Sequence, residues 1–479
     1  MNLRLEIRIL SGLLALLGLF QLVPIAAAIY FHEPFWPFLS VGLGGILVGL
    51  PVAWFCKTED RRIRPRDGFL VVSLAWILAS LYGALPYLTT GALGPVDAIF
   101  ESVSGFSTTG STVFTAIEDQ THALLLWRSL TQWLGGMGII LFTIAILPLL
   151  GIGGMQLFKA EVPGPVADKV SPRVAATARR LWLIYVGFTA AEWLALRLAG
   201  MSGFDALCHS FTTAASGGFS TKSASIGAFE SSLIEWIVIF FMLMAGINFV
   251  LHYRLLTGRI RSVWEDAELR YFLAVIGVVA FLFMFVVPRV PGMDASIGLR
   301  ESLFTTLTIL TTTGYTTTNF EAWPSLAQMI ILHLMILGGM SGSTSGGVKS
   351  LRALLGFRAL RASFARLIHP HVVRPVKYGG KPVDDNVIGA IWSFFTAYVF
   401  IGTFCAAVVA FAGYDLVTSI SASLSALSNI GPGLGDIGPT DNFAHFPGYV
   451  KFTLCFGMIA GRLEIFTLLV LFQPEFWRR

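Results

Sequence analysis

Four short segments centred on a glycine hold the residues of this chain that are best suited to chemistry. Each is rich in small residues and carries no charge; they are Thr108–Thr112, Ser216–Ser220, Thr312–Thr316 and Asn429–Gly433. Glycine reaches backbone angles closed to other residues, so nearby carbonyl oxygens can turn toward one axis. Four such loops can replace the hydration shell of a potassium ion, as in potassium-channel filters. We therefore expect cation coordination from these residues.

In each loop, the candidate ligands are the glycine and the two residues before it. They are Thr108, Thr109 and Gly110; Ser216, Gly217 and Gly218; Thr312, Thr313 and Gly314; and Asn429, Ile430 and Gly431. The fourth loop differs from the others, because Asn429 and Ile430 replace a hydroxyl-rich approach and Pro432 follows its glycine. We expect this loop to contribute a less symmetric set of ligands.

The stretches that lead into the four glycines align without a gap. Three of them open with a carboxylate thirteen residues before the glycine. A hydroxyl recurs five residues after that start, at Ser102, Ser210, Thr306 and Ser423. An acidic start and a glycine-terminated end are typical of a short capped helix. A single run of this kind is more often a packing or loop feature, but four in one register indicate an internal repeat.

The composition indicates that these loops lie within a membrane. Of 479 residues, 55% are hydrophobic and 13% are charged, and the mean hydropathy is +0.73. A soluble protein of this size carries about 25% charged residues. Apolar runs near the roughly 20 residues needed to span a bilayer predict about ten spanning helices. Two are expected near 9–31 and 36–56, and the others in pairs that flank the loops, near 68–89 and 122–150, 180–200 and 232–256, 270–289 and 324–355, and 387–413 and 447–472.

Each glycine loop lies between two spanning helices and is too short to cross the membrane itself. It must enter and return, and non-helical backbone at that depth is tolerated only inside protein or beside a watery cavity. The predicted fold is an all-α polytopic membrane protein with four helix–pore helix–helix units around one pore. The predicted organisation is two N-terminal helices over 1–66, then units over 67–160, 161–262, 263–366 and 367–479.

The charges predict the orientation of the chain. The net charge of +5 comes from Lys and Arg gathered in short loops, which argues against a nucleic-acid partner and marks those loops as cytoplasmic. The basic stretches are Lys57–Arg66, Lys159–Arg180, Arg254–Arg261, Arg352–Lys381 and Arg478–Arg479. Both termini are then cytoplasmic, and the first helix is retained. The opposite loops are mainly acidic, which would concentrate cations at the entrance.

A glycine-rich stretch, Leu337–Lys349, interrupts the second helix of the third unit. Five glycines in ten residues oppose a helix by about 1 kcal/mol each relative to alanine. A phosphate loop is a poor match, because Val348 separates the last glycine from Lys349. A plain flexible break in the helix remains an alternative.

Arg462 is a lone cation in the apolar stretch Gly457–Leu463. A charge expected in the middle of a membrane helix is a functional hypothesis by default. A local ion pair with Glu464 is the structural alternative, although residues two apart on a helix point away from each other.

At these loops the sequence resembles the Trk/Ktr superfamily of potassium transporters, in its TrkH/TrkG-type bacterial branch. Trp127–Gly138 and Ala245–Phe249 are similar to signatures of that family, and the resemblance covers essentially the whole chain. It implies potassium uptake across the bacterial inner membrane, a homodimer in the lipid bilayer, and cytosolic TrkA-type nucleotide-binding regulatory subunits. Because all four glycines are retained, it favours potassium as the transported ion.

The resemblance also implies a gate. The glycine-rich stretch would form an intramembrane loop that obstructs the pore beneath the filter, and Arg462 would face the pore beside it. The gate residues implied are Gly338, Gly339, Gly342, Gly346, Gly347, Lys349 and Arg462.

Three other functions are alternatives to potassium uptake through a gated pore. A membrane enzyme would need clustered His, Asp or Glu, whereas the eight His are dispersed, so we expect no enzyme. Substrate-coupled transporters often have inverted repeats, whereas these four units run in parallel. Potassium symport with sodium or protons stays open, because no coupling site is visible in the sequence.

Overall fold

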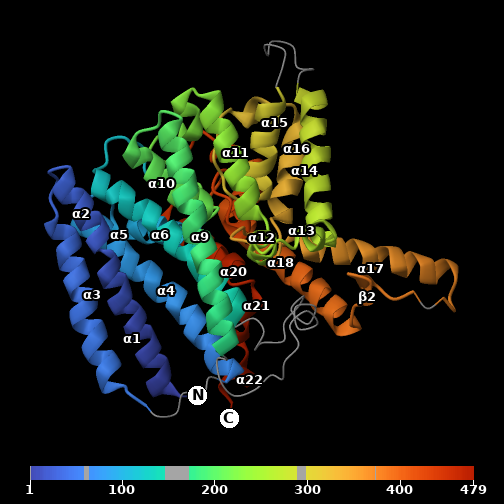
Figure 1. Ribbon diagram of the computed structural model, residues 1–479, viewed down its shortest axis with the longest axis horizontal. Coiled ribbons are helices and arrows are strands. Elements are labelled where there is room, and N and C mark those ends of the chain that lie inside the picture. Colours follow the sequence, from blue (N-terminus) through green and yellow to red (C-terminus); the bar gives the residue numbers. More distant parts are fainter. Residues whose placement is uncertain (1, 59–63, 146–171, 288–297, 373, 479) are drawn as a thin grey trace.

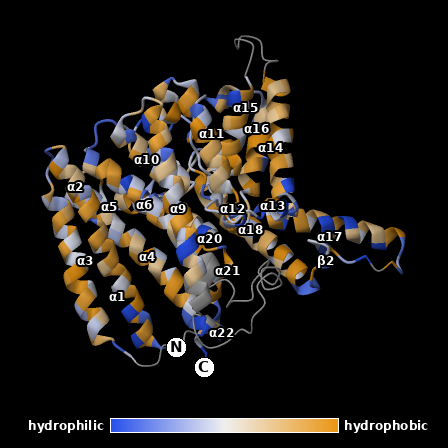
Figure 2. Cartoon of the chain, viewed as in Figure 1, coloured by the Kyte–Doolittle hydropathy of each residue, from blue (hydrophilic) through white to orange (hydrophobic). Residues whose placement is uncertain are grey.

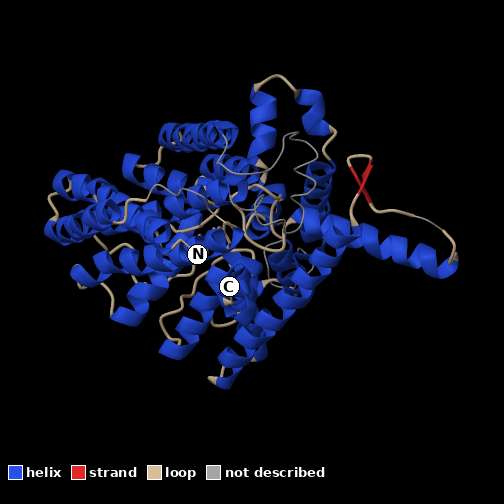
Figure 3. Ribbon diagram, turned by 90° about the horizontal axis from the view of Figure 1, so that it is seen from below, coloured by secondary structure: helices blue, strands red, loops and turns tan. Residues whose placement is uncertain are grey.

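The computed structural model describes residues 2–58, 64–145, 172–287, 298–372 and 374–478. Over these residues the chain is helical, apart from one short antiparallel hairpin of β1 (Lys377–Tyr378) and β2 (Lys381–Pro382). This hairpin lies at the edge of the molecule (Figure 3). The predicted all-α class is confirmed.

Two N-terminal spans stand side by side at one flank (Figure 1). The first is formed by α1 (Leu3–Phe20) and α2 (Leu22–Tyr30), and the second by α3 (Trp36–Phe55). Glycines permit their close approach, since a Cβ on Gly18 would lie 2.7 Å from the Gly42 carbonyl oxygen. A Cβ on Gly49 would lie 2.6 Å from that of Ser11.

The rest of the chain repeats one pattern four times: a long helix, a short pore helix and a second helix. The first helices are α4 (Pro65–Thr89), α9 (Pro172–Leu198), α14 (Ala267–Val286) and α18 (Asp385–Phe411). The pore helices are α5 (Pro95–Phe106), α10 (Gly203–Ala214), α15 (Leu299–Leu310) and α19 (Leu416–Ser428). The second helices are α6 (His122–Ala145), α11 (Ser232–Gly246) with α12 (Phe249–Leu256), α16 (Ser325–Leu337) followed by α17 (Ser350–Ile368), and α20 (Gly448–Arg462) with α21 (Phe466–Leu469).

Short elements fill the connections. They are α13 (Ile260–Trp264), α22 (Pro474–Trp477) and the 3₁₀ turns η1 (Ser225–Phe229), η3 (Phe320–Ala322) and η4 (Val470–Phe472). Both ends of the chain lie at the same end of the molecule, and α17 projects from the body (Figure 1).

The long helices present apolar side chains outward, as a membrane protein requires. Six helices in the described part of the chain are long and apolar enough to cross a bilayer, or eight if each of two bent pairs counts as one span. Helices α3 and α14 are coloured mainly as hydrophobic in Figure 2. Phe55, Phe400 and Phe411 are 77%, 72% and 86% exposed, a state that is stable only against lipid or protein. The chain is a multi-pass membrane protein.

The second helices differ from the sequence prediction. Residues 232–256 and 447–472 were each expected to form one long helix, and this is wrong: α11 and α12 meet at 102°, and α20 meets the helical turns that follow it at 109°. At the first break, segment 338–349 supplies the missing backbone partners. Met340 N–H donates to Gly246 O at 2.9 Å, and Phe249 N–H donates to Gly342 O at 3.1 Å. The predicted end of helix 122–150 and the basic residues 159–171 lie outside the described residues.

Candidate ion pore

Each pore helix ends in the same turn. The residue two positions before each central glycine is left-handed: φ is 55° at Thr108, 53° at Ser216, 58° at Thr312 and 57° at Asn429. In the first loop, Thr108 N–H donates to Gly105 O at 2.9 Å, and Thr109 N–H donates to Ser104 O at 2.8 Å. This is the double closure of a Schellman motif, and the same pair of bonds recurs in the other three loops.

The residue that closes these turns is not the one predicted. A glycine was expected to end each helix, but a Thr, Ser or Asn occupies the first left-handed position instead. A β-branched residue such as Thr108 or Thr312 is rarely found there, and such strain is concentrated at functional sites. The central glycines lie two residues further on, also with positive φ.

The four central glycines pack around one axis. A Cβ added to any of them would face the carbonyl oxygen before the glycine of the next loop, and in three of the four cases it would collide with it. The four pairs are Gly110 with Gly217 O at 2.2 Å, Gly218 with Thr313 O at 1.8 Å, Gly314 with Ile430 O at 1.9 Å and Gly431 with Thr109 O at 3.0 Å. The contacts run from loop 1 to loop 4 and back to loop 1, where the loops are numbered in chain order. The contacts therefore form a closed ring, and the space beside the glycine is largest at Gly431.

The side chains of the loops are not equivalent. In loops 1 and 3 a hydroxyl pair locks each turn: Ser107 Oγ lies 2.7 Å from Thr109 Oγ1, and Thr311 Oγ1 lies 2.8 Å from Thr313 Oγ1. In loop 4, Asn429 Nδ2 instead donates to Thr109 Oγ1 of loop 1 at 2.9 Å. Loops 1 and 3 therefore share one construction, and loop 4 has another.

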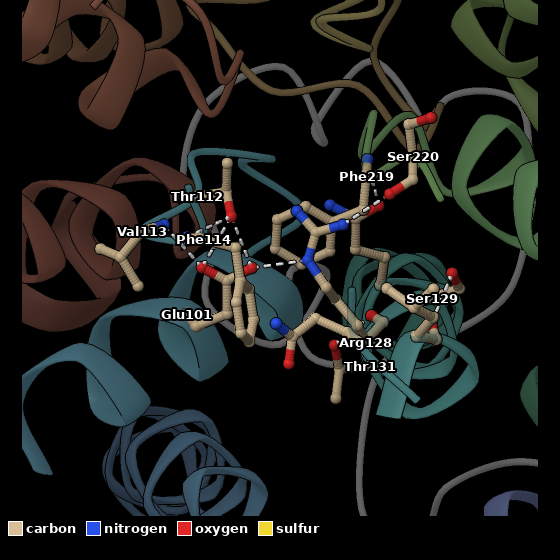
Figure 4. A network of polar contacts seen from close by, with 12 residues as sticks. Glu101, Thr112, Val113, Phe114, Arg128, Ser129, Thr131, Phe219 and Ser220 are labelled. Atoms are coloured by element: carbon tan, nitrogen blue, oxygen red, sulfur yellow. Dashed lines mark hydrogen bonds and ion pairs between the residues drawn. The ribbon is translucent and has the colours of Figure 1, made fainter. Parts of the chain in front are cut away.

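A buried ion pair stands behind loops 1 and 2 (Figure 4). Arg128 Nε on α6 lies 2.6 Å from Glu101 Oε1 on α5, and Arg128 also donates to Ser220 O at 2.8 Å. Its guanidinium lies 3.6 Å from the centre of the Phe219 ring. Glu101 in turn accepts from Val113 N–H at 2.9 Å. The pair thus connects the return segments of both loops.

Segment 338–349 lies against the residues that follow the ends of the pore helices. Gly346 N–H donates to Thr312 Oγ1 at 2.6 Å, and Thr344 Oγ1 lies 2.8 Å from Ser216 Oγ. A Cβ on Gly346 would lie 2.1 Å from Ser428 O. The segment therefore contacts loops 2 and 3, each at the residue two positions before the central glycine, and the end of α19.

Arg462 also reaches this segment. It is 2% exposed, and its Nη1 donates to Thr344 O at 2.7 Å. Among the described residues, its Nε and Nη2 have no hydrogen-bond partner. The prediction that it sits in the middle of a helix is wrong, because α20 ends at Arg462 itself. Glu464, the alternative partner, pairs with Arg352 of α17 instead.

Two further side chains hold main-chain atoms of the segment. Glu268 Oε1 on α14 accepts from Ser341 N–H at 2.6 Å. Lys349 is buried and donates to Ser345 O. Lys349 was predicted as a gate residue from the sequence, whereas Glu268 was not. The available signal was a second carboxylate, two residues after the helix-capping Asp266, at the start of an apolar helix.

Nothing in the described part of the chain gathers three or more His, Cys, Asp or Glu side chains into a metal site. The polar groups available at the ring are carbonyl oxygens and hydroxyls. Uncharged oxygens of this kind suit a weakly hydrated monovalent cation, as in potassium-channel filters.

Comparison with known proteins agrees with this geometry. The family model for TrkH, described as a cation transport protein, matches residues 45–479. This chain belongs to the TrkH family. The resemblance drawn from the glycine loops is thereby confirmed, and the family is one of transporters rather than enzymes.

Named members of the TrkH family are similar to the chain over its whole length. It is 40% identical to the Trk system potassium uptake protein TrkH of Salmonella typhimurium, over 98% of this chain and 96% of that protein. It is 36% identical to TrkG of Escherichia coli K12, over 97% and 96%. The crystal structure of the potassium transporter TrkH from Vibrio parahaemolyticus superposes with a TM-score of 0.92 at 36% identity and covers both chains fully.

Proposed function

We propose that this chain takes up potassium ions across the bacterial inner membrane through a filter formed by the four loops. The observation that carries the proposal is the closed ring of glycine–carbonyl contacts, which brings four repeated segments to one axis. The full-length relatives, which are named potassium uptake proteins, support potassium as the ion.

The proposed ligands are oxygens of the glycine and the two residues before it in each loop. They are Thr108, Thr109 and Gly110; Ser216, Gly217 and Gly218; Thr312, Thr313 and Gly314; and Asn429, Ile430 and Gly431. Four pore helices end directly before these residues, and each C-terminus carries a partial negative charge of about half an electron. This charge favours a cation beneath the ring without a formal anion that would bind it too tightly.

The proposed gate is segment 338–349. Its hydrogen bonds to Ser216 and Thr312 support this proposal, because an ion that passes the proposed filter would meet the segment there. Gly338, Gly339, Gly342, Gly346 and Gly347 allow it to change shape, and Lys349 and Glu268 each hold one of its main-chain atoms. Arg462 adds a positive charge at the same level and raises the barrier to a cation.

The proposed assembly is a homodimer that works with cytosolic TrkA-type nucleotide-binding subunits. Helix α17 supports this proposal, because it projects from the body of the protein (Figure 1). It exposes Phe357, Phe364 and Leu367 by 58%, 55% and 78%, alongside arginines such as Arg361. A projecting apolar and basic helix suits a protein contact at the membrane surface.

Growth rescue tests the function directly. The gene should restore growth of a potassium-uptake-deficient bacterium at low external potassium. Replacement of Gly218 by Ser should abolish the rescue, because its side chain has no space beside Thr313 O. A chain that is present in the membrane but gives no rescue in its wild-type form would contradict the proposal.

A further inference from the structure

Loop 2 lacks the side chains that lock loops 1 and 3. The hydroxyl pair Ser107–Thr109 in loop 1 corresponds to Thr311–Thr313 in loop 3. At the same places loop 2 has Ala215 and Gly217, which have no hydroxyl. The Gly217 carbonyl is nevertheless one member of the ring, since it packs against Gly110. Some other group has to hold this carbonyl in place.

That group is the amide of Gln132 on α6. Gln132 Nε2 donates to Gly217 O at 2.7 Å, and Gln132 Oε1 accepts from Phe219 N–H at 3.1 Å. One side chain therefore holds the backbone on both sides of Gly218. Gln132 is fully buried, so neither bond is shared with bulk water.

Gln132 also fills the volume that a side chain at position 217 would need. A Cβ on Gly217 would lie 2.4 Å from both Cδ and Oε1 of Gln132. The φ of Gly217 is not in the left-handed range, so space rather than backbone strain excludes a side chain there. Gly217 and Gln132 are therefore complementary in shape: the missing side chain of one leaves the space that the other fills.

Residues one helical turn before and after Gln132 on α6 also contact loop 2. Arg128, four residues before Gln132, donates to Ser220 O at 2.8 Å. Gly136, four residues after it, packs so closely on Ala215 that a Cβ would lie 2.8 Å from the Ala215 Cα. Residues four apart share a helix face, so one stripe of α6 supports loop 2 along its length.

We propose that Gln132 is a positioning residue for ion selection, whose amide stands in for the side chain that loop 2 lacks at Gly217. It holds the Gly217 carbonyl level with those of Thr109 and Thr313, so that the ring keeps one diameter. This inference rests on the proposed function of the four loops as a potassium filter.

The test compares ion fluxes in vesicles that contain the purified protein. Q132M keeps the length of the side chain but removes both hydrogen bonds. We expect it to lower the flux ratio of potassium to sodium by about tenfold, the change that one unsatisfied buried carbonyl can cause. M242L is the matched control. Met242 lies four residues before Gly246 on α11, as Gln132 lies four before Gly136, and its replacement should leave the ratio unchanged.

A side-chain exchange tests the complementarity. G217T alone should lose most transport, because threonine collides with Gln132. The double variant Q132A/G217T should transport potassium at least tenfold faster than G217T, since alanine frees the space, but it should not regain the wild-type ratio of potassium to sodium flux, because it has no amide to hold the carbonyl at position 217. If Q132M does not fold, the comparison of G217T with Q132A/G217T is the test of the proposal. No recovery in the double variant would overturn the proposal.

Other outcomes separate this inference from the proposed function. If the wild type discriminates potassium from sodium and Q132M does so equally well, Gln132 has no role in selection. If the wild-type protein itself shows no discrimination, the filter proposal fails first. A fall in thermal stability of Q132M with an unchanged flux ratio would show a merely structural residue, and would also overturn the inference.

Discussion

At the scale of single residues, the pore is supported by buried polar groups that each hold a main-chain atom. Glu101 and Arg128 hold the return segments of loops 1 and 2, and Arg462 holds Thr344. Burying such charges is costly unless they are paired and hydrogen-bonded. Their positions beside the loops indicate that they fix geometry rather than add stability.

The first prediction concerns the buried pair. Glu101→Gln should destabilise the protein by about 3–5 kcal/mol, because Arg128 would be left buried without its counter-charge. Thermal unfolding in detergent measures this loss. Glu265→Gln, whose partner Arg261 is 93% exposed on its side chain, serves as a control and should change little. Equal stability of both variants would contradict the role of the pair.

The second prediction concerns Arg462. Arg462→Gln should raise potassium flux in vesicles by about tenfold, because roughly 1–2 kcal/mol of repulsion beneath the filter is removed. Arg462→Lys keeps the charge and should behave more like the wild type. A folded glutamine variant with unchanged or lower flux would contradict the proposed barrier.

The residues of the loops could be predicted from the sequence because their pattern is local. Gly110, Gly218, Gly314 and Gly431 share one register, and their uncharged surroundings are visible without a structure. The contacts of Gln132 with Gly217 and of Glu268 with Ser341 could not be predicted, since they join residues more than 70 positions apart. The pairing of Glu464 with Arg352 was missed for the same reason.

At the scale of elements, the second helices of units two and four depart from the prediction, unlike that of unit three, whose interruption the glycines predicted. The helices of units two and four are each bent at a break, whereas hydropathy alone predicts one continuous apolar helix. The break after Gly246 is tolerated because segment 338–349 accepts and donates the freed hydrogen bonds. The break after Gly246 and segment 338–349 therefore depend on each other. If the segment moved, the Gly246 carbonyl and the Phe249 N–H would lose their hydrogen-bond partners.

The third prediction concerns α17. The double variant Phe364→Ala, Leu367→Ala should shift the purified protein from dimer to monomer, because these exposed side chains belong to the apolar surface of the projecting helix. Light scattering of the detergent-solubilised protein measures the mass. Phe55→Ala, on α3 at the opposite flank (Figure 1), should leave the mass unchanged. A wild-type monomer, or a dimer in all variants, would contradict the proposed contact.

At the scale of the whole molecule, four similar units form an unequal ring. Three of the glycine sites have no room for a Cβ, whereas at Gly431 the nearest carbonyl would be 3.0 Å away. The hydroxyl pairs of loops 1 and 3, the Gln132 amide at loop 2 and Asn429 in loop 4 are three ways of holding one ring. A single chain can vary its units independently, which a symmetric tetramer cannot.

The most direct test of the filter is a graded series of glycine variants. Potassium and sodium fluxes should be measured in vesicles for Gly110→Ser, Gly218→Ser, Gly314→Ser and Gly431→Ser. The first three should lose potassium selectivity by at least about tenfold, because each new Cβ displaces a ring carbonyl. Gly431→Ser should lose less, since its site is the loosest. Folded variants that all retain the wild-type ratio of potassium to sodium flux would contradict the assignment of these loops as the filter.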